Sequence, residues 1–199
     1  MVHNLIAADK NTIDNADYGI WAERSQVMVY NNDFKNITNV PPPLGTVPTK
    51  REPCPRGTAI CSYTDANYYF AELHIGGMAQ NEANLFDNCG KGVVSNFSHH
   101  INIVKNNFNN INQTAVEVND AEWRNIKIDR NNFTAATTGV NIWNCVFSPV
   151  DVINNNFDLA NKTNGTAIIL RAIYPSGPCT NAQCAQQLYL QLQQWHSYR

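Results

Sequence analysis

The chain has 199 residues, a formal net charge of −2 and 15% charged residues, and this length is sufficient for one domain with a sizeable core. No dense run of Lys and Arg could neutralise a phosphate backbone, so we predict no nucleic-acid partner, and no segment is long and apolar enough to span a membrane. Asparagine is far more frequent than in ordinary proteins. Because Asn is a poor helix former and tolerates left-handed backbone, this composition predicts a chain that turns often.

The first strands are predicted close to the N-terminus. The opening residues lack the apolar run of a signal peptide, so we expect the chain to be a piece of a longer protein whose export signal lies upstream. One predicted strand opens at a small residue and covers residues 19–22. The next covers residues 27–30, where Val27 and Val29 alternate with other side chains and therefore point to one side. Two Asn residues and Phe34 follow it.

Residues 39–66 interrupt this pattern and are rich in proline, which cannot donate to a β ladder, so they are predicted to form a loop inserted in one coil. Cys54 and Cys61 lie within it, and Cys179 and Cys184 lie close together near the C-terminus. The even total of six cysteines suits an oxidising compartment. Neither pair has the CxxC spacing of a zinc site. We therefore predict two loop-stapling disulfides and no metal site.

Beyond the insert, the pattern of the second strand returns at regular intervals. A divergent copy occupies residues 84–88, and close copies occupy residues 101–108, 126–133 and 150–157. Each close copy has β-branched residues on alternate positions, then two consecutive Asn residues and a Phe. The residues that we expect to stack are Asn106, Asn107, Phe108, Asn131, Asn132, Phe133, Asn155, Asn156 and Phe157.

The spacing of the phenylalanines gives the period of the repeat. Phe108, Phe133 and Phe157 follow one another at an almost constant interval, which corresponds to one coil of a solenoid. Phe34 precedes Phe108 by close to three such steps. Between the copies, a short strand opens at a small residue, as it does at residues 19–22. These strands cover residues 92–95, 115–118, 139–142 and 165–170.

Such short strands cannot make a stable sheet alone, but coils stacked about 4.8 Å apart join them into parallel ladders around a narrow core. The sequence therefore predicts an all-β fold over residues 1–174, a right-handed parallel β-helix, that is, a single-stranded solenoid with coils of about 24 residues. Residues 175–199 are predicted to form an irregular tail. We expect the Asn pairs to turn the chain and to stack as ladders, and the Phe rings to form a column at the next corner.

The repeat unit also resembles a known family. Alternating β-branched residues, an Asn pair and a Phe, followed by a strand such as Gly92-Val93 or Gly139-Val140, are similar to the right-handed parallel β-helix repeat family, which is allied in fold to pectate lyases. Within that family the chain is most similar to Asn-rich repeat proteins that bacteria export. The resemblance implies an extracellular or cell-surface location. It does not select an activity, because the family includes lyases, hydrolases, epimerases and adhesins.

Charged residues provide one candidate site. A lyase-like site needs carboxylates that hold calcium and an Arg or Lys that removes a proton beside a uronate carboxylate. The densest charged stretch covers residues 117–130. The candidate catalytic residues are Lys127, Asp129, Arg130 and Asp151. Alternation places Lys127 and Asp151 outside, one coil apart, whereas Asp129 shares its column with two apolar residues and is expected at a strand end. The simpler interpretation is that these charges pair across coils, contributing roughly 0–1 kcal/mol per pair.

Aromatic and amide residues provide a second candidate site. Exposed aromatic rings can stack on sugars, and the candidate ligand-binding residues are Glu117, Asn141, Trp21 and Trp143. Tyr68-Tyr69-Phe70 is a further aromatic run, and Trp143 could instead pack under a loop. Six Asn-x-Ser/Thr sequons occur, at Asn36, Asn96, Asn112, Asn132, Asn161 and Asn164.

Two functions follow from these observations. The first is an extracellular or cell-surface scaffold or binding module that presents a flat face to polysaccharide or to a partner. The alternative is a polysaccharide-processing enzyme, a pectate-lyase-like lyase or a glycoside hydrolase. The first needs no cofactor, whereas a lyase-like enzyme would need Ca²⁺.

Overall fold

The computed structural model describes residues 2–3, 10–38, 54–64, 72–79, 81–121, 125–145, 148–160 and 162–171. These residues form 18 β-strands in three parallel sheets of six strands each. Most of the Pro-rich insert and the whole C-terminal tail lie outside the described residues. The described part contains no helix of the length and apolarity that crossing a membrane would require.

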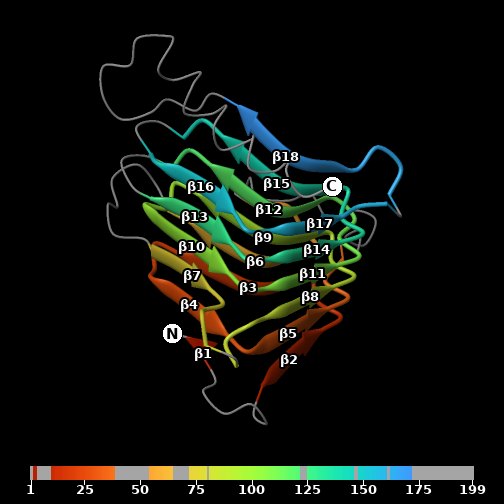
Figure 1. Ribbon diagram of the computed structural model, residues 1–199. Coiled ribbons are helices and arrows are strands. Elements are labelled where there is room, and N and C mark those ends of the chain that lie inside the picture. Colours follow the sequence, from red (N-terminus) through yellow and green to blue (C-terminus); the bar gives the residue numbers. More distant parts are fainter. Residues whose placement is uncertain are drawn as a thin grey trace, which may run out of the picture.

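Each coil contributes one strand to each sheet, so the molecule is a parallel β-solenoid (Figure 1). Sheet A contains β1 (Val2–His3), β4 (Val27–Tyr30), β7 (Glu72–Ile75), β10 (His100–Val104), β13 (Ile126–Asp129) and β16 (Val150–Ile153). Sheet B contains β2 (Asn11–Asp14), β5 (Asn32–Lys35), β8 (Leu85–Asp87), β11 (Asn107–Asn109), β14 (Asn132–Thr134) and β17 (Asn156–Asp158). Sheet C contains β3 (Tyr18–Glu23), β6 (Thr58–Tyr63), β9 (Lys91–Asn96), β12 (Thr114–Asn119), β15 (Thr138–Trp143) and β18 (Thr166–Arg171). The predicted solenoid is confirmed, whereas its handedness stays a prediction.

The predicted Phe column is confirmed in register. Phe108 pairs with Phe133, and Phe133 pairs with Phe157, on adjacent strands of sheet B. The ring centroids of Phe108 and Phe133 are 5.0 Å apart with planes 8° from parallel, and Phe86 and Phe34 continue the stack. The rings occupy the middle of sheet B strands and not a corner, because each coil has a third strand where the sequence predicted a turn.

The spacing of the first copies corrects one prediction. Phe34 lies in β5, Phe86 in β8 and Phe108 in β11, and these three strands are direct neighbours in sheet B. The segment from Phe34 to Phe108 therefore covers two layers and not three, and the coil from Phe34 to Phe86 is much longer than the others. Extra chain between two strands does not disturb the register of the strands themselves, which side-chain stacking fixes.

A ladder of Asn side chains follows sheet A along the solenoid axis. Asn106 Oδ1 accepts the backbone N–H of Asn84 at 3.1 Å and its side-chain amide at 2.9 Å. In the next two layers, Asn131 Oδ1 accepts the same two N–H groups of Asn106, and Asn155 Oδ1 accepts those of Asn131. Each Nδ2 also donates to a carbonyl of the neighbouring layer, as Asn106 does to Ile75 at 2.9 Å. The predicted Asn ladder is confirmed for the first residue of each pair.

The second Asn of each pair has a different role. Asn107 is exposed, and Asn132 and Asn156 bond to each other at 2.7 Å near the surface. The sharp turn is made one residue before the ladder, where Lys105, with φ 58°, has left-handed backbone. Arg130, Asn154 and Asn31 repeat it. The prediction that the Asn pair turns the chain is therefore wrong by one residue, because the turn lies just before the ladder Asn.

Candidate functional site

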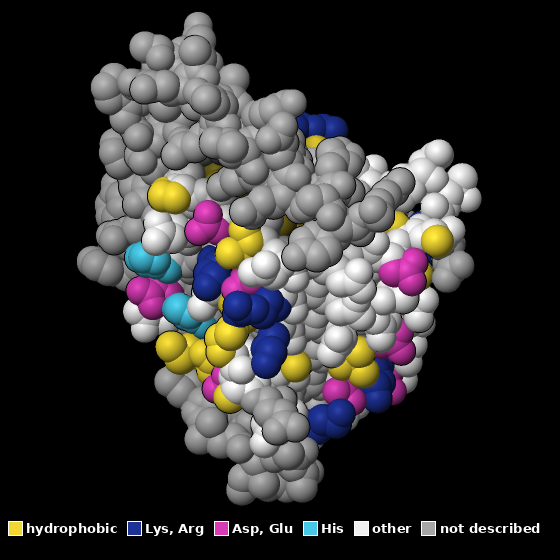
Figure 2. Space-filling view, in the orientation of Figure 1, with side chains coloured by type: hydrophobic (Ala, Val, Ile, Leu, Met, Phe, Trp, Pro, Cys, Tyr) yellow, Lys and Arg dark blue, Asp and Glu magenta, His cyan; other side chains and the backbone are white. Residues whose placement is uncertain are grey.

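The outer face of sheet A carries the candidate catalytic residues. Lys127 and Asp151 are register neighbours on β13 and β16, as predicted. Asn102 and His74 precede Lys127 in the same outward file. Figure 2 shows this face, where basic, acidic and histidine side chains lie intermixed over the strands of sheet A. The face is a charge mosaic and not a patch of one sign.

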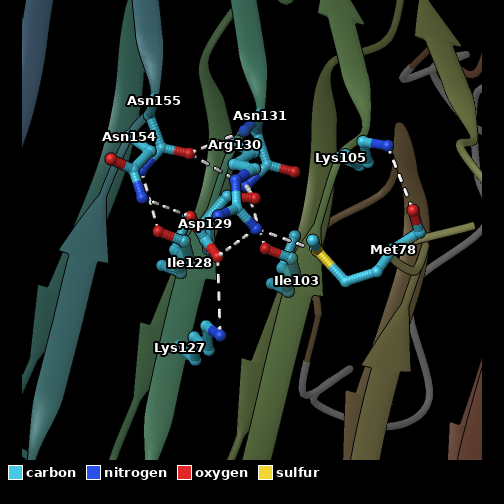
Figure 3. A network of polar contacts seen from close by, with 10 residues as sticks. All are labelled: Met78, Ile103, Lys105, Lys127, Ile128, Asp129, Arg130, Asn131, Asn154 and Asn155. Atoms are coloured by element: carbon cyan, nitrogen blue, oxygen red, sulfur yellow. Dashed lines mark hydrogen bonds and ion pairs between the residues drawn. The ribbon is translucent and has the colours of Figure 1, made fainter.

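Asp129 is the centre of a polar network on this face (Figure 3). It is the last residue of β13, and Val104 and Ile153 are its register neighbours, so the predicted strand-end position is confirmed. Its side chain is only 2% exposed. Asn154 Nδ2 donates to its Oδ1 at 3.0 Å, and its Oδ2 lies 3.4 Å from Lys127 Nζ.

Arg130 and Lys105 extend the network to the loop after β7. Arg130 Nη1 lies 3.4 Å from Asp129 Oδ2 and 3.1 Å from Met78 Sδ. Lys105 Nζ donates to the carbonyl of Met78 at 3.0 Å. Both long side chains therefore contact Met78, as Figure 3 shows.

This network brings together three candidate catalytic residues, Lys127, Asp129 and Arg130, but the two basic side chains are paired with the carboxylate. Both carboxylate oxygens of Asp129 already face N–H donors, and Lys127 is paired with it. The side chain of Asp151 is exposed. In the part of the chain that the structure describes, no three His, Cys, Asp or Glu side chains are grouped so that they could hold a metal ion. The charges pair with one another, as the simpler interpretation expects, but Lys127, Asp129 and Arg130 do so within one coil and not across coils.

The outer face of sheet C carries the candidate ligand-binding residues. Glu117 and Asn141 are register neighbours on β12 and β15. Trp143 lies two residues after Asn141 on the same strand and so points to the same side. Trp21 shares the file of Glu117 but lies three strands away on β3. The structure therefore brings three of the four candidates together and leaves Trp21 apart.

A disulfide between Cys54 and Cys61 lies on this face at β6, the neighbour of β3, which confirms the first predicted pair. Both cysteines are fully buried and pack with Val94 and Tyr18. Asn96 Nδ2 lies 3.5 Å from Cys54 Sγ, which ties the disulfide to β9. The disulfide thus separates Trp21 from the part of sheet C formed by β12, β15 and β18.

We call that part the platform, defined by Glu117, Asn119, Asn141, Trp143 and Arg171. Trp143 is 50% exposed, and it is flanked in register by Asn119 and Arg171. The Asn141 side-chain oxygen is buried and has no hydrogen-bond partner among the residues that the structure describes. A buried carbonyl without a donor carries a desolvation cost, which a rotation of the amide toward a ligand hydroxyl or a water molecule on the outer face relieves.

Glu117 is less free than its neighbours. Lys91 Nζ lies 2.5 Å from its Oε2, and both side chains are mostly buried. Asn119 Nδ2 donates to its Oε1 at 3.1 Å. Glu117 therefore fixes the floor of the platform. Sequence reasoning did not single out Asn119 or Arg171, and the signal that finds them is the register with Trp143.

Among the cysteines that the structure describes, Cys89 and Cys145 are free, and both are buried. Burial raises the pKa of the Cys89 thiol to about 11, and burial raises the pKa of the Cys145 thiol to about 11. They fill turn positions stacked on apolar neighbours, so they act as small core residues and not as nucleophiles. Burial, and secondarily the charge of Glu82, raise the pKa of Tyr30.

Several predicted features fall outside the described residues. They are Tyr68-Tyr69-Phe70, the sequon at Asn161 and the disulfide between Cys179 and Cys184. Among the other sequons, Asn112 and Asn164 are exposed, whereas Asn96 is buried.

Comparison of the chain with models of known protein families, with curated proteins and with solved structures found no match.

Proposed function

We propose that this β-solenoid is a non-catalytic binding module, located outside the cell or on its surface, whose platform binds a polysaccharide. The observation that supports it best is the pairing of a half-exposed Trp143 ring with the unpartnered oxygen of Asn141 on one flat sheet face. A disulfide in the described chain is compatible with an oxidising compartment.

The chemistry of the platform suits a sugar chain. An indole ring offers a large apolar surface to the C–H face of a sugar ring. Asn141, two residues away on the same side of β15, offers an acceptor that a sugar hydroxyl can satisfy. Parallel strands about 4.8 Å apart hold these groups rigidly, so little side-chain entropy is lost on binding.

The test uses affinity electrophoresis of the purified chain in gels that contain xylan, mixed-linkage glucan or polygalacturonate. We expect at least one polymer to retard the wild-type chain, and Trp143→Ala to weaken that binding by about tenfold or more, because a central aromatic contact contributes more than about 1 kcal/mol. Trp21→Ala is the matched control, since Trp21 is 39% exposed on the same sheet but outside the platform.

Retardation by none of the three polymers, or equal weakening by both substitutions, would contradict the proposal. The alternative, a lyase or hydrolase, is tested in the same experiment. If the wild-type chain with added Ca²⁺ shortens polygalacturonate, the module is an enzyme, and the mosaic around Lys127 and Asp129 becomes the place to look for its base.

A further inference from the structure

One asparagine of this chain is unlike the others. Asn164 precedes Gly165, and no other Asn in the sequence is followed by glycine. The pair lies in the exposed turn between β17 and β18, where Asn164 has left-handed backbone with φ 61°. Its side-chain amide has no hydrogen-bond partner among the described residues. The Gly165 N–H reaches the carbonyl of Lys162 only at 3.3 Å, beyond the usual range of such bonds.

The ladder asparagines are held at both reacting groups. The Asn131 amide bonds to Asn155 and to the carbonyl of Ile103. The backbone N–H that follows it, that of Asn132, donates to the carbonyl of Asn106 at 2.9 Å. The Asn131 amide carbon and the Asn132 nitrogen are thus held by separate hydrogen bonds. They cannot approach each other unless these ladder bonds break.

Five other asparagines in left-handed turns are held by their side chains. Asn110 Nδ2 donates to Asp87 Oδ1 at 3.0 Å, and the next residue, Ile111, is fully buried. The same kind of contact to a neighbouring layer holds Asn36, Asn88, Asn144 and Asn154. Asn88, Asn110 and Asn154 are exposed as Asn164 is, but only Asn164 combines exposure with an unbonded side-chain amide and a following glycine.

From this contrast we infer that Asn164 is a site of spontaneous deamidation. The backbone nitrogen of Gly165 attacks Cγ of Asn164, the new C–N bond closes a succinimide, and the side-chain nitrogen leaves as ammonia with the proton of that N–H. Water then opens the ring at either carbonyl to give aspartate or isoaspartate. Glycine favours the attack because it places no Cβ beside the nucleophile.

The modification changes the last described coil. Either product adds a negative charge to the turn, and isoaspartate also adds a methylene to the backbone between β17 and β18. Thr166 begins β18 with a hydrogen bond from its N–H to the carbonyl of Thr137 at 2.9 Å. A longer turn strains this first contact of β18 with β15, so the effect falls at the end of sheet C.

The test is peptide mapping by mass spectrometry of the native chain, incubated at mildly alkaline pH. We expect the peptide with Asn164 to gain the mass of an amide-to-acid exchange roughly tenfold faster than any other Asn peptide, because only there is the attacking nitrogen that of a glycine. Asn164→Gly keeps the left-handed backbone and should abolish this species. Unfolding in guanidinium should raise the rates at Asn110 and Asn131 and change that at Asn164 least.

Two results would overturn the inference. One is an Asn164 peptide that stays unmodified in the native chain while the same peptide, excised and free, reacts. The other is a second Asn that reacts as fast in the native chain. Neither result depends on a polysaccharide ligand, so the outcome is independent of the proposed function.

Discussion

At the scale of single residues, the ladder asparagines are used at every polar atom. Asn106 accepts two N–H groups of Asn84 through Oδ1 and donates to carbonyls of Ile75 and Val104 and to the Oδ1 of Asn131. Buried turns leave backbone groups that regular strands cannot pair. The short amide side chain supplies both a donor and an acceptor at that point, which no apolar residue of similar size can do.

Two adjacent residues allow a direct test of this role. Asn106→Ala should lower the free energy of unfolding by about 2–4 kcal/mol, because it leaves buried N–H and C=O groups without partners. Asn107→Ala, the same change one residue later on an exposed side chain, should cost less than about 0.5 kcal/mol. Urea unfolding followed by circular dichroism measures both. Equal losses would show that the ladder is not what stabilises the turn.

At the scale of elements, sheet C fits against the Phe column through a file of small residues. The file alternates strictly along the axis as Gly19, Ala59, Gly92, Ala115, Gly139 and Ala167. A Cβ at Gly92 would lie 2.8 Å from the Phe108 ring and would also meet the carbonyl of Ala115. A glycine at this position is therefore required both by the ring beside it and by the backbone carbonyl of the next layer.

We expect Gly92→Ala to destabilise the chain by about 1–3 kcal/mol through overpacking. Phe108→Leu, combined with it in a double-mutant cycle, should recover part of this loss, because the smaller side chain frees the space that the new methyl group needs. Chemical denaturation of the four variants gives the coupling energy. Strict additivity would mean that the ring is not the obstacle.

At the scale of the whole molecule, the sequence predicted the parts of the architecture that repeat. Val27, Ile101, Ile126 and Val150 recur in one register because each must point into the same core, and a period of this kind is visible without coordinates. The insertion between Phe34 and Phe86 made the predicted number of layers wrong, because the spacing alone does not show how many layers a long segment crosses.

The candidate sites were predicted less completely than the fold. The sequence singled out Trp143 and Asn141 as candidates, but it did not show that each coil has three strands, which puts the two candidate sites on different sheets. The third strand, with Phe108 at its centre, reads in the sequence as part of a turn, because so short a strand shows no clear alternation. Without it, the separation of Lys127 on sheet A from Glu117 on sheet C could not be anticipated.

Because two thiols are buried, the free energy of unfolding of the whole chain should vary with pH in the alkaline range. With the pKa of Cys89 and Cys145 raised to about 11 by burial, the folded state holds these protons more tightly than the unfolded state, whose cysteines titrate at about 8.5. The stabilisation that the two protonated thiols give the folded state is fully present below about pH 8.5, and it is lost as the pH rises toward about 11. Each thiol should raise the unfolding constant by up to about tenfold per pH unit in this window.

Free energies of unfolding across this window measure the slope. Tyr and Lys side chains also titrate there, so the control is the double variant Cys89→Ala/Cys145→Ala, which should show a shallower decline than the wild-type chain. Parallel declines would mean that the thiols ionise without unfolding.

The long coil between Phe34 and Phe86 has a consequence for how such a protein can be altered. Phe34 and Phe86 stack with ring centroids 5.0 Å apart although β6 and β7 lie between them in the sequence. Lengthening a connection between two of these strands therefore costs little more than loop closure, about 0.6 kcal/mol for each doubling of its length. Foreign peptides grafted at this point would be displayed on a rigid rod without repacking its interior. Natural selection has the same freedom, since new sequence can be acquired, tried and discarded there while every other layer keeps its place.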